Sequence, residues 1–329
     1  MWLRKQHFGL FAALALALVI SCNKKNPIER YGVGAVREVI VVYDDELTDV
    51  GYNLAMYLAA DTFYTPHPEP LMFVESATSK EFQESFRGAR NSVILAVKGG
   101  EAEKILKEAF GRKLRFGIQS KAQALPEGGF VIGVYMPTPD SLRNFMATNG
   151  KKVKELLLAR FYEVYRRMAF LAGKRKDIPK ELWERYGFTF DIPNGFAYTA
   201  IDSHFVAFAK HYPDRFIFIF WDDTTRTLDP DSIVALRDSL TEKYYEGDYV
   251  LKGYWRAEQD TFLGYQAVKI TGAWQNDRRI MGGPFRLYAF NRKGRFYMVD
   301  LGVYYPEEIY KFGYIMRLEV IARTLRFRD

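Results

Sequence analysis

The stretch EVIVVY at residues 38–43 is a nearly continuous apolar run with the length of one β-strand. Runs of this kind are typical of strands buried on both faces, as in a parallel sheet that helices cover. Asp44 and Asp45 follow directly, and acidic residues favour the amino end of a helix. The sequence therefore predicts a module of alternating strands and helices that starts at this strand.

The alternation continues from this strand to about residue 171. Apolar residues at helical spacing predict helices over 47–58, 101–110, 140–146 and 151–171, and another that opens at Thr78 or Ser79. Short apolar runs predict further strands over 71–75, 92–97, 114–118 and 130–136. This order implies right-handed crossovers and a sheet that is at least partly parallel.

A second module, rich in strands, is predicted over residues 179–329. The basic run at 174–176 and Pro179 end the long helix, so we place the boundary between the modules near residue 178. Asp229 and Pro230 are typical residues for the start of a helix. The other predicted elements are strands over 188–192, 196–201, 205–210, 215–221, 264–273, 285–291 and 295–303, and a final helix over 306–325.

The expected fold class is therefore α+β. An α/β module over residues 37–178, with a partly parallel sheet, precedes a module over residues 179–329 whose antiparallel sheet is flanked by helices.

The first 21 residues have the parts of an export signal. Arg4 and Lys5 supply a positive start, residues 8–20 are apolar, and the small residue Ser21 follows. A helix needs about 20 apolar residues to span a bilayer, and this run is shorter. We therefore predict a cleavable signal peptide over residues 1–21.

The motif VISC at residues 19–22 resembles the bacterial lipobox, whose cysteine thiol takes a diacylglycerol. The resemblance implies lipidation of Cys22, with fatty acids such as palmitate, and a membrane-attached protein. Residues 22–36 would form the lipidated tether. Asn23 follows the cysteine without an acidic run, which by resemblance to similar leaders implies an outer-membrane lipoprotein that faces the periplasm. Cys22 is the only cysteine, so the lipid would leave no disulfide and no thiol chemistry.

The charge of the chain is mildly basic. Loss of Arg4 and Lys5 with the signal peptide lowers the formal net charge from +7 to +5. Both signs are interspersed along the chain, so we expect no nucleic-acid partner and only a weak preference for anionic lipid or wall polymers.

Two resemblances extend these predictions. The stretch FTFDIPNGF at 188–196, with the late strand pair and the terminal helix, resembles the PsbP and Mog-type superfamily of binding and assembly factors, which implies an α-β-α sandwich. The whole mature chain resembles an uncharacterised family of Bacteroidota-type lipoproteins, known as a domain of unknown function. That second resemblance rests on residues 38–44, 68–73, 91–94, 218–221 and 282–285.

Residues that could carry catalysis or bind a metal are few. His67, His204 and His211 do not form a close ligand pair, and the acids Asp222, Asp223, Asp229 and Asp231 lack the spacing of a calcium loop. The chain has no GxSxG elbow, no Walker loop and no GxGxxG after a strand. We therefore expect no metal and no cofactor.

Three tryptophans and two glycines are the candidate binding residues. Trp221, Trp255 and Trp274 fall at strand ends or in irregular stretches, where an indole ring often lies at a surface. They could form a platform for a carbohydrate or a protein partner. Gly282 and Gly283 precede a proline and predict a rigid turn with close backbone approach, and ligand contact as a second possibility.

The sequence thus favours a non-enzymatic, membrane-anchored binding or assembly factor of the cell envelope, with an envelope protein or a glycan as partner. One alternative is a periplasmic hydrolase of wall glycan or peptide. It would use paired carboxylates drawn from Asp191, Asp202, Asp222, Asp223 and Asp300. A structural envelope protein is the other alternative.

Overall fold

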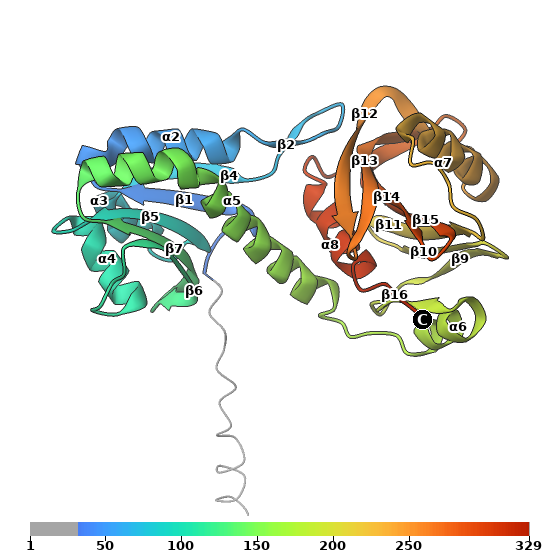
Figure 1. Cartoon of the computed structure of the whole chain (residues 1–329), viewed down its shortest axis with the longest axis horizontal. Coiled ribbons are helices and arrows are strands. Elements are labelled where there is room, and N and C mark those ends of the chain that lie inside the picture. The colour runs from blue at the N-terminus through green and yellow to red at the C-terminus, as the bar shows by residue number, and fades with distance from the viewer. Residues whose placement is uncertain (1–31, 329) are drawn as a thin grey trace, which may run out of the picture.

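The computed structural model describes residues 32–328 as two α+β modules joined by a long helix, and the predicted fold class is confirmed (Figure 1). The predicted signal peptide, Cys22 and most of the predicted tether lie outside the described residues. Within the described range, no helix combines the length and the apolar character needed to cross a bilayer.

The first module contains a five-stranded mixed sheet in the order β4-β1-β5-β7-β6. β1, β4, β5 and β7 are parallel, and β6 pairs antiparallel with β7. The main elements are β1 (Glu38–Tyr43), α2 (Thr48–Ala59), β4 (Phe73–Thr78), α3 (Ser79–Glu81), β5 (Asn91–Val97), α4 (Glu101–Phe110), β6 (Gly117–Leu125), β7 (Gly128–Met136) and α5 (Pro139–Ala169). Two short strands, β2 (Thr62–Phe63) and β3 (Glu69–Pro70), form a small hairpin.

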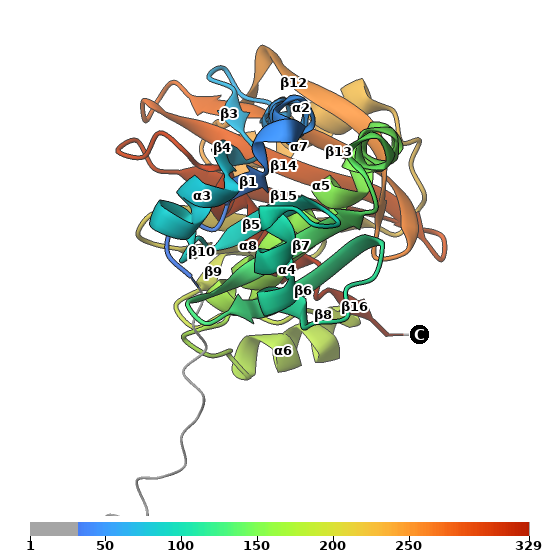
Figure 2. The same ribbon diagram turned by 90° about the vertical axis from the view of Figure 1, so that its left-hand side faces the viewer.

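Helices cover both faces of this sheet, as the apolar run at 38–43 predicts. Val39 and Val41 face α2 and α5, whereas Ile40 and Val42 face α4. Figure 2, in which this module faces the viewer, shows α2 and α4 on opposite sides of the strands. The continuous apolar character of β1 therefore follows from burial on both sides.

Helix α5 is one continuous helix of 31 residues, so the prediction of two helices was wrong. Thr138 and Ser141 form a reciprocal cap at its start. Gly150, which interrupts the apolar pattern, lies inside the helix. Figure 1 shows that α5 runs alongside α2 and then turns toward the second module.

The second module contains a seven-stranded antiparallel sheet in the order β12-β13-β14-β15-β11-β10-β9. Asp229 caps α7 as predicted, because its carboxylate accepts the backbone N–H of Ser232 at 2.9 Å. The elements are α6 (Asp177–Tyr186), β8 (Phe188–Thr189), β9 (Ala197–Asp202), β10 (Phe205–Lys210), β11 (Asp214–Asp222), α7 (Pro230–Tyr244), β12 (Tyr249–Phe262), β13 (Tyr265–Asn276), β14 (Met281–Arg292), β15 (Arg295–Tyr304), α8 (Phe312–Ala322) and β16 (Arg326–Phe327).

The second sheet is also covered on both faces. Phe218, Phe285 and Met298 pack with α7, whereas Val299 and Tyr288 pack with α8. The predicted sandwich of helix, sheet and helix is therefore present. The predicted boundary at residue 178 falls inside α6, and a division there stays a prediction.

The modules meet along α8, which one buried apolar cluster joins to α5 and to both sheets. Phe63 of the small hairpin contacts Phe312 of α8, with ring centroids 5.1 Å apart. The hydroxyl of Tyr64 donates to the carbonyl oxygen of Gly253 in β12 at 3.2 Å. The hairpin therefore extends from the first module onto the second (Figure 1).

Candidate functional site

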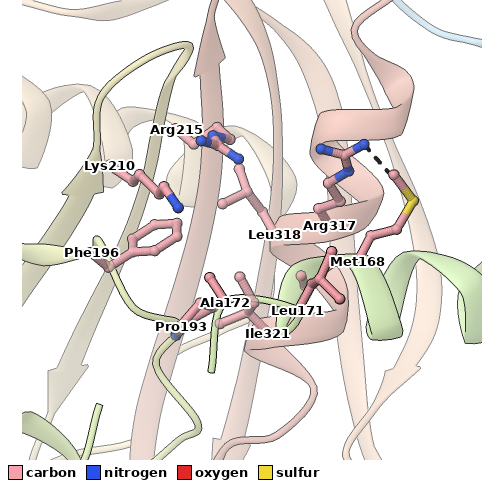
Figure 3. A pocket seen from close by; sticks show the side chains of 11 residues that line it. Met168, Leu171, Ala172, Pro193, Phe196, Lys210, Arg215, Arg317, Leu318 and Ile321 are labelled. Atoms are coloured by element: carbon pink, nitrogen blue, oxygen red, sulfur yellow. Dashed lines mark hydrogen bonds between the residues drawn. The ribbon is translucent and has the colours of Figure 1, made fainter. Parts of the chain in front are cut away.

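A hollow of about 300 Å³ lies where α5 ends against the second module. Three cations line it: Lys210 at the end of β10, Arg215 near the start of β11, and Arg317 on α8. Figure 3 shows Lys210 and Arg215 on one side and Arg317 on the opposite side, next to Met168. Its volume is at the lower end of the range of about 300–1,000 Å³ typical of ligand pockets.

The register of two strands brings Lys210 and Arg215 together. β10 and β11 form a hairpin in which Lys210 lies directly opposite Arg215. Like charges at such positions destabilise a sheet. Burial, followed by the charge of Arg215, lowers the pKa of the Lys210 ammonium. Burial and the charge of Arg317 likewise lower the pKa of Arg215.

Each of these two side chains donates to a backbone carbonyl. Lys210 Nζ donates to the carbonyl oxygen of Asn194 at 3.2 Å, and Arg215 Nε donates to that of Pro213 at 3.1 Å. Gly195 has φ +90°, and a Cβ there would lie 3.0 Å from Lys210 Nζ. The positive φ favours glycine in the turn at 193–195, and a larger residue there would also crowd the Lys210 side chain.

Arg317 approaches from α8. Its guanidinium lies 5.3 Å from the ring centroid of Tyr314, and Nη2 lies 3.9 Å from the sulfur of Met168. Its buried Nε has no hydrogen-bond partner among the described residues. A buried donor without a partner costs free energy until an acceptor reaches it.

No carboxylate in residues 32–328 lies within ion-pair distance of these three cations. Asp214, next to Arg215 in the sequence, pairs with His211 instead. The hollow thus contains three positive charges that the described protein does not neutralise. Such a site attracts an anion.

The remaining walls of the hollow are apolar. Phe196, Leu318 and Ile321 are buried and belong to the second module. Met168 and Leu171 come from the end of α5 and the turn after it, and they are 39% and 87% exposed. Both modules therefore contribute to the hollow, the second with its cations and the first with an exposed apolar edge.

Two larger hollows lack this excess of charge. One, of about 450 Å³, lies between α2 and α5, where Asp49 and Arg143 form an ion pair. The other, of about 680 Å³, lies beside β1 and β4, where Glu38 and Arg90 bond to nearby backbone. The charged groups named there have partners within the protein.

The three predicted tryptophans do not form a shared surface. Trp221 is 4% exposed and packs against Tyr186 and Phe188 on one side of the second sheet. Trp274 is 3% exposed and packs on the other side. Only Trp255, on β12, is half-buried. The expected surface position is therefore wrong for Trp221 and Trp274, because inward strand positions place both rings in the core, and a binding role stays untested.

Gly282 and Gly283 form no turn. They lie within β14, where Gly283 pairs with Trp274, so the predicted rigid turn was wrong. The predicted close backbone approach is present, because a Cβ on Gly283 would lie 2.0 Å from the carbonyl oxygen of Val303. Their small size therefore serves strand packing, and ligand contact by these residues stays a prediction.

The five aspartates of the hydrolase alternative each contact a different basic side chain. The pairs are Asp191 with Lys174, Asp202 with Lys243, Asp222 with Arg226, Asp223 with Arg295 and Asp300 with Arg237. Asp300 and Arg237 are fully buried. These ion pairs explain the aspartates without a catalytic role.

Two of the histidines have side-chain partners. His204 Nε2 lies 3.1 Å from Asp223 and His211 contacts Asp214, whereas at His67 the backbone carbonyl oxygen accepts from Thr65. Across residues 32–328, no three His, Cys, Asp or Glu side chains gather in a group that could hold a metal ion.

None of the three cations, Lys210, Arg215 and Arg317, was predicted from the sequence. The first two flank a predicted hairpin turn, so their cross-strand pairing was accessible from the strands at 205–210 and 215–221. Arg317 lies about 100 residues further along, and only the packing of α8 brings it to the hollow.

Comparison with known proteins is informative for the second module. Residues 175–324 match the family model described as Domain of unknown function (DUF4837). The predicted resemblance to a domain of unknown function is thus supported over this range. No curated protein matches the chain.

Several solved structures resemble part of this chain. The Ran-binding protein Mog1p of Saccharomyces cerevisiae is 15% identical, and the match covers 44% of this chain and 91% of that one with a TM-score of 0.32. The cyanobacterial PsbP of Synechocystis is 14% identical (43% and 86% covered, TM-score 0.28). LpqN of Mycobacterium tuberculosis, involved in cell envelope biogenesis, is 10% identical (43% and 83% covered, TM-score 0.28). These values describe a distant likeness of fold.

Proposed function

We propose that this chain is a non-enzymatic binding protein, anchored by lipid in the bacterial cell envelope, whose hollow takes an anionic ligand. The observation that carries the proposal is the grouping of Lys210, Arg215 and Arg317 around one hollow without a neutralising carboxylate among the described residues. An anion there offsets the repulsion between the cations.

Binding is favoured over catalysis by the chemistry of the lining. The described lining side chains are cationic or apolar, and they include no carboxylate or imidazole. General acid–base catalysis relies mostly on those two groups. The cations are therefore best suited to hold a charge in place.

Inorganic phosphate tests this proposal. The test protein starts at residue 22 and carries Cys22→Ser, so that it has no lipid. A ligand that binds the folded state raises the melting temperature of a protein. Phosphate should therefore raise the melting temperature of the test protein with the wild-type hollow. Lys210→Gln should reduce the rise, whereas Lys252→Gln, which removes an exposed lysine on β12, should not. A rise of equal size in both variants, or no rise in the wild type, would contradict the proposal.

The envelope location rests on VISC at 19–22 and on Asn23 after it. An outer-membrane lipoprotein that faces the periplasm is shielded from proteases added outside the cell. Protease treatment of intact cells should therefore leave the protein whole, and treatment after the outer membrane is opened should degrade it. Degradation in intact cells would show the opposite orientation.

A further inference from the structure

We infer that the anion is the phosphate group of an amphiphilic lipid, held with its head in the hollow and its chain along the end of α5. The inference rests on the proposed function and adds the class of the ligand. Three features of the hollow support it: the arrangement of its cations, its volume, and the apolar edge at its opening.

The cations favour a phosphate over a carboxylate. Lys210, Arg215 and Arg317 come from three separate elements and approach the hollow from different sides (Figure 3). A carboxylate has two oxygen atoms in one plane, whereas a phosphate monoester offers three around a tetrahedral centre. A tetrahedral anion therefore offers one oxygen to each of the three cations.

The apolar walls favour a ligand with a hydrocarbon part. Phe196, Leu318 and Ile321 form a buried apolar surface beside the cations. Leu171 is 87% exposed and Met168 is 39% exposed, and both line the same hollow. A free phosphate would leave the exposed side chains of Leu171 and Met168 in water, whereas a chain attached to the phosphate would cover them.

The volume limits how much of the ligand enters. About 300 Å³ accommodates a head group and the first methylene groups, and the rest of a long chain must lie outside. The exposed Leu171 is placed where that chain would leave the hollow. The protein would thus bind the polar head of the lipid and contact only the adjoining part of its hydrocarbon chain.

Three probes separate this inference from the proposed function: inorganic phosphate, lauroyl lysophosphatidate and the uncharged monolaurin. Calorimetric titration should show lysophosphatidate binding about tenfold or more tightly than phosphate, the gain expected when roughly two methylene groups leave water. Monolaurin should bind far more weakly. Equal affinity for lysophosphatidate and phosphate would overturn the lipid inference and leave anion binding intact.

Two further outcomes concern the proposed function itself. If monolaurin bound as tightly as lysophosphatidate, the phosphate group would not hold the lipid and the lipid inference would be wrong. If neither charged probe bound, both proposals would be wrong.

A matched pair of variants tests the apolar edge. Leu171→Ser should reduce lysophosphatidate affinity several-fold and leave phosphate affinity unchanged, because the side chain is exposed and contributes little to folding. Ile309→Ser removes a similarly exposed side chain outside the hollow lining, 80% exposed, and should change neither affinity. An unchanged lysophosphatidate affinity in Leu171→Ser would place the chain elsewhere and contradict the inference.

Discussion

Glu69 of the first module caps α8 of the second, because its carboxylate accepts the backbone N–H of Phe312 at 2.7 Å. The same oxygen accepts the N–H of Lys311 at 2.7 Å, and the other oxygen pairs with Arg37. Glu69 and Arg37 are 4% and 5% exposed. One buried carboxylate therefore satisfies donors from both modules at their junction.

Replacement of Glu69 should weaken the whole protein. Glu69→Ala leaves Arg37 buried without its partner, which typically costs about 3–5 kcal/mol of unfolding free energy. Glu101→Ala, which removes an exposed ion pair with Lys104, should cost less than about 1 kcal/mol. Urea unfolding measures both. Losses of equal, small size would show that the buried pair does not hold the modules together.

Glu319 should make stability depend on pH in the acid range. Burial raises the pKa of this carboxyl, but the charges of Arg286 and Arg323 and the hydrogen bonds from Arg323 and Tyr288 hold it at about 2. A carboxyl group whose pKa is lower in the folded than in the unfolded protein stabilises the fold. This contribution is complete above the pKa of the unfolded state, about 4.5, and is lost as pH falls toward 2.

The variant Glu319→Gln isolates this effect. The difference in unfolding free energy between wild type and variant should shrink between about pH 4.5 and 2, by on the order of 3 kcal/mol. Urea unfolding at a series of pH values measures the difference. A difference that stays constant over this range would contradict the assigned role of the carboxylate.

Removal of one cation from the hollow should stabilise the ligand-free protein. Lys210→Gln ends the repulsion across the β10–β11 pair, which is worth about 0.2–1 kcal/mol for like charges at opposed positions. Unfolding free energy should rise by that amount in the absence of phosphate, and Lys252→Gln should change it little. A loss of stability in Lys210→Gln would mean that the ammonium serves mainly to hold the turn at 193–195.

Cys22→Ser should block lipidation. Because the thiol is the acceptor of the lipid in proteins with a lipobox, the variant should persist as the uncleaved precursor. Labelling of cells with a fatty acid, with mass measurement of the purified protein, checks this. Equal labelling of wild type and variant would refute the lipoprotein prediction.

The second module should fold by itself, although less stably than in the whole chain. A fragment of residues 175–329 keeps the sheet with α7 and α8 but loses the Glu69 cap and the Phe63 contact. We expect a cooperative thermal transition at a lower temperature than in the full protein. A fragment without a cooperative transition would show that the two modules form one folding unit.

Local patterns in the sequence predicted most elements of the fold but not its longer-range features. The runs at 38–43 and 92–97 are buried on both faces, and their strands were predicted within one residue. β12 was missed because it is an edge strand with many exposed polar residues, so it lacks a clear apolar alternation. α5 was predicted as two helices, over 140–146 and 151–171, whereas the intervening residues 147–150 continue the same helix.

The candidate site was beyond sequence reasoning for a related reason. Trp221 and Trp274 were predicted to lie at a surface because an indole ring often does, but both rings are buried in the core. Lysine and arginine occur throughout the chain, so nothing in the sequence marks Lys210 or Arg317 as unusual. What distinguishes them is the absence of a carboxylate nearby in the described structure, and only the packed arrangement reveals that.

The strand register that sets Lys210 opposite Arg215 makes the hollow sensitive to ionic strength. Side-chain rotation cannot move either charge to another part of the sheet. Dissolved counter-ions must therefore screen the repulsion between the two charges. At an ionic strength of 0.15 M the screening length is about 8 Å, and it grows to about 30 Å at 0.01 M. The attraction of the hollow for an anion therefore extends furthest in dilute surroundings and shortens as salt accumulates.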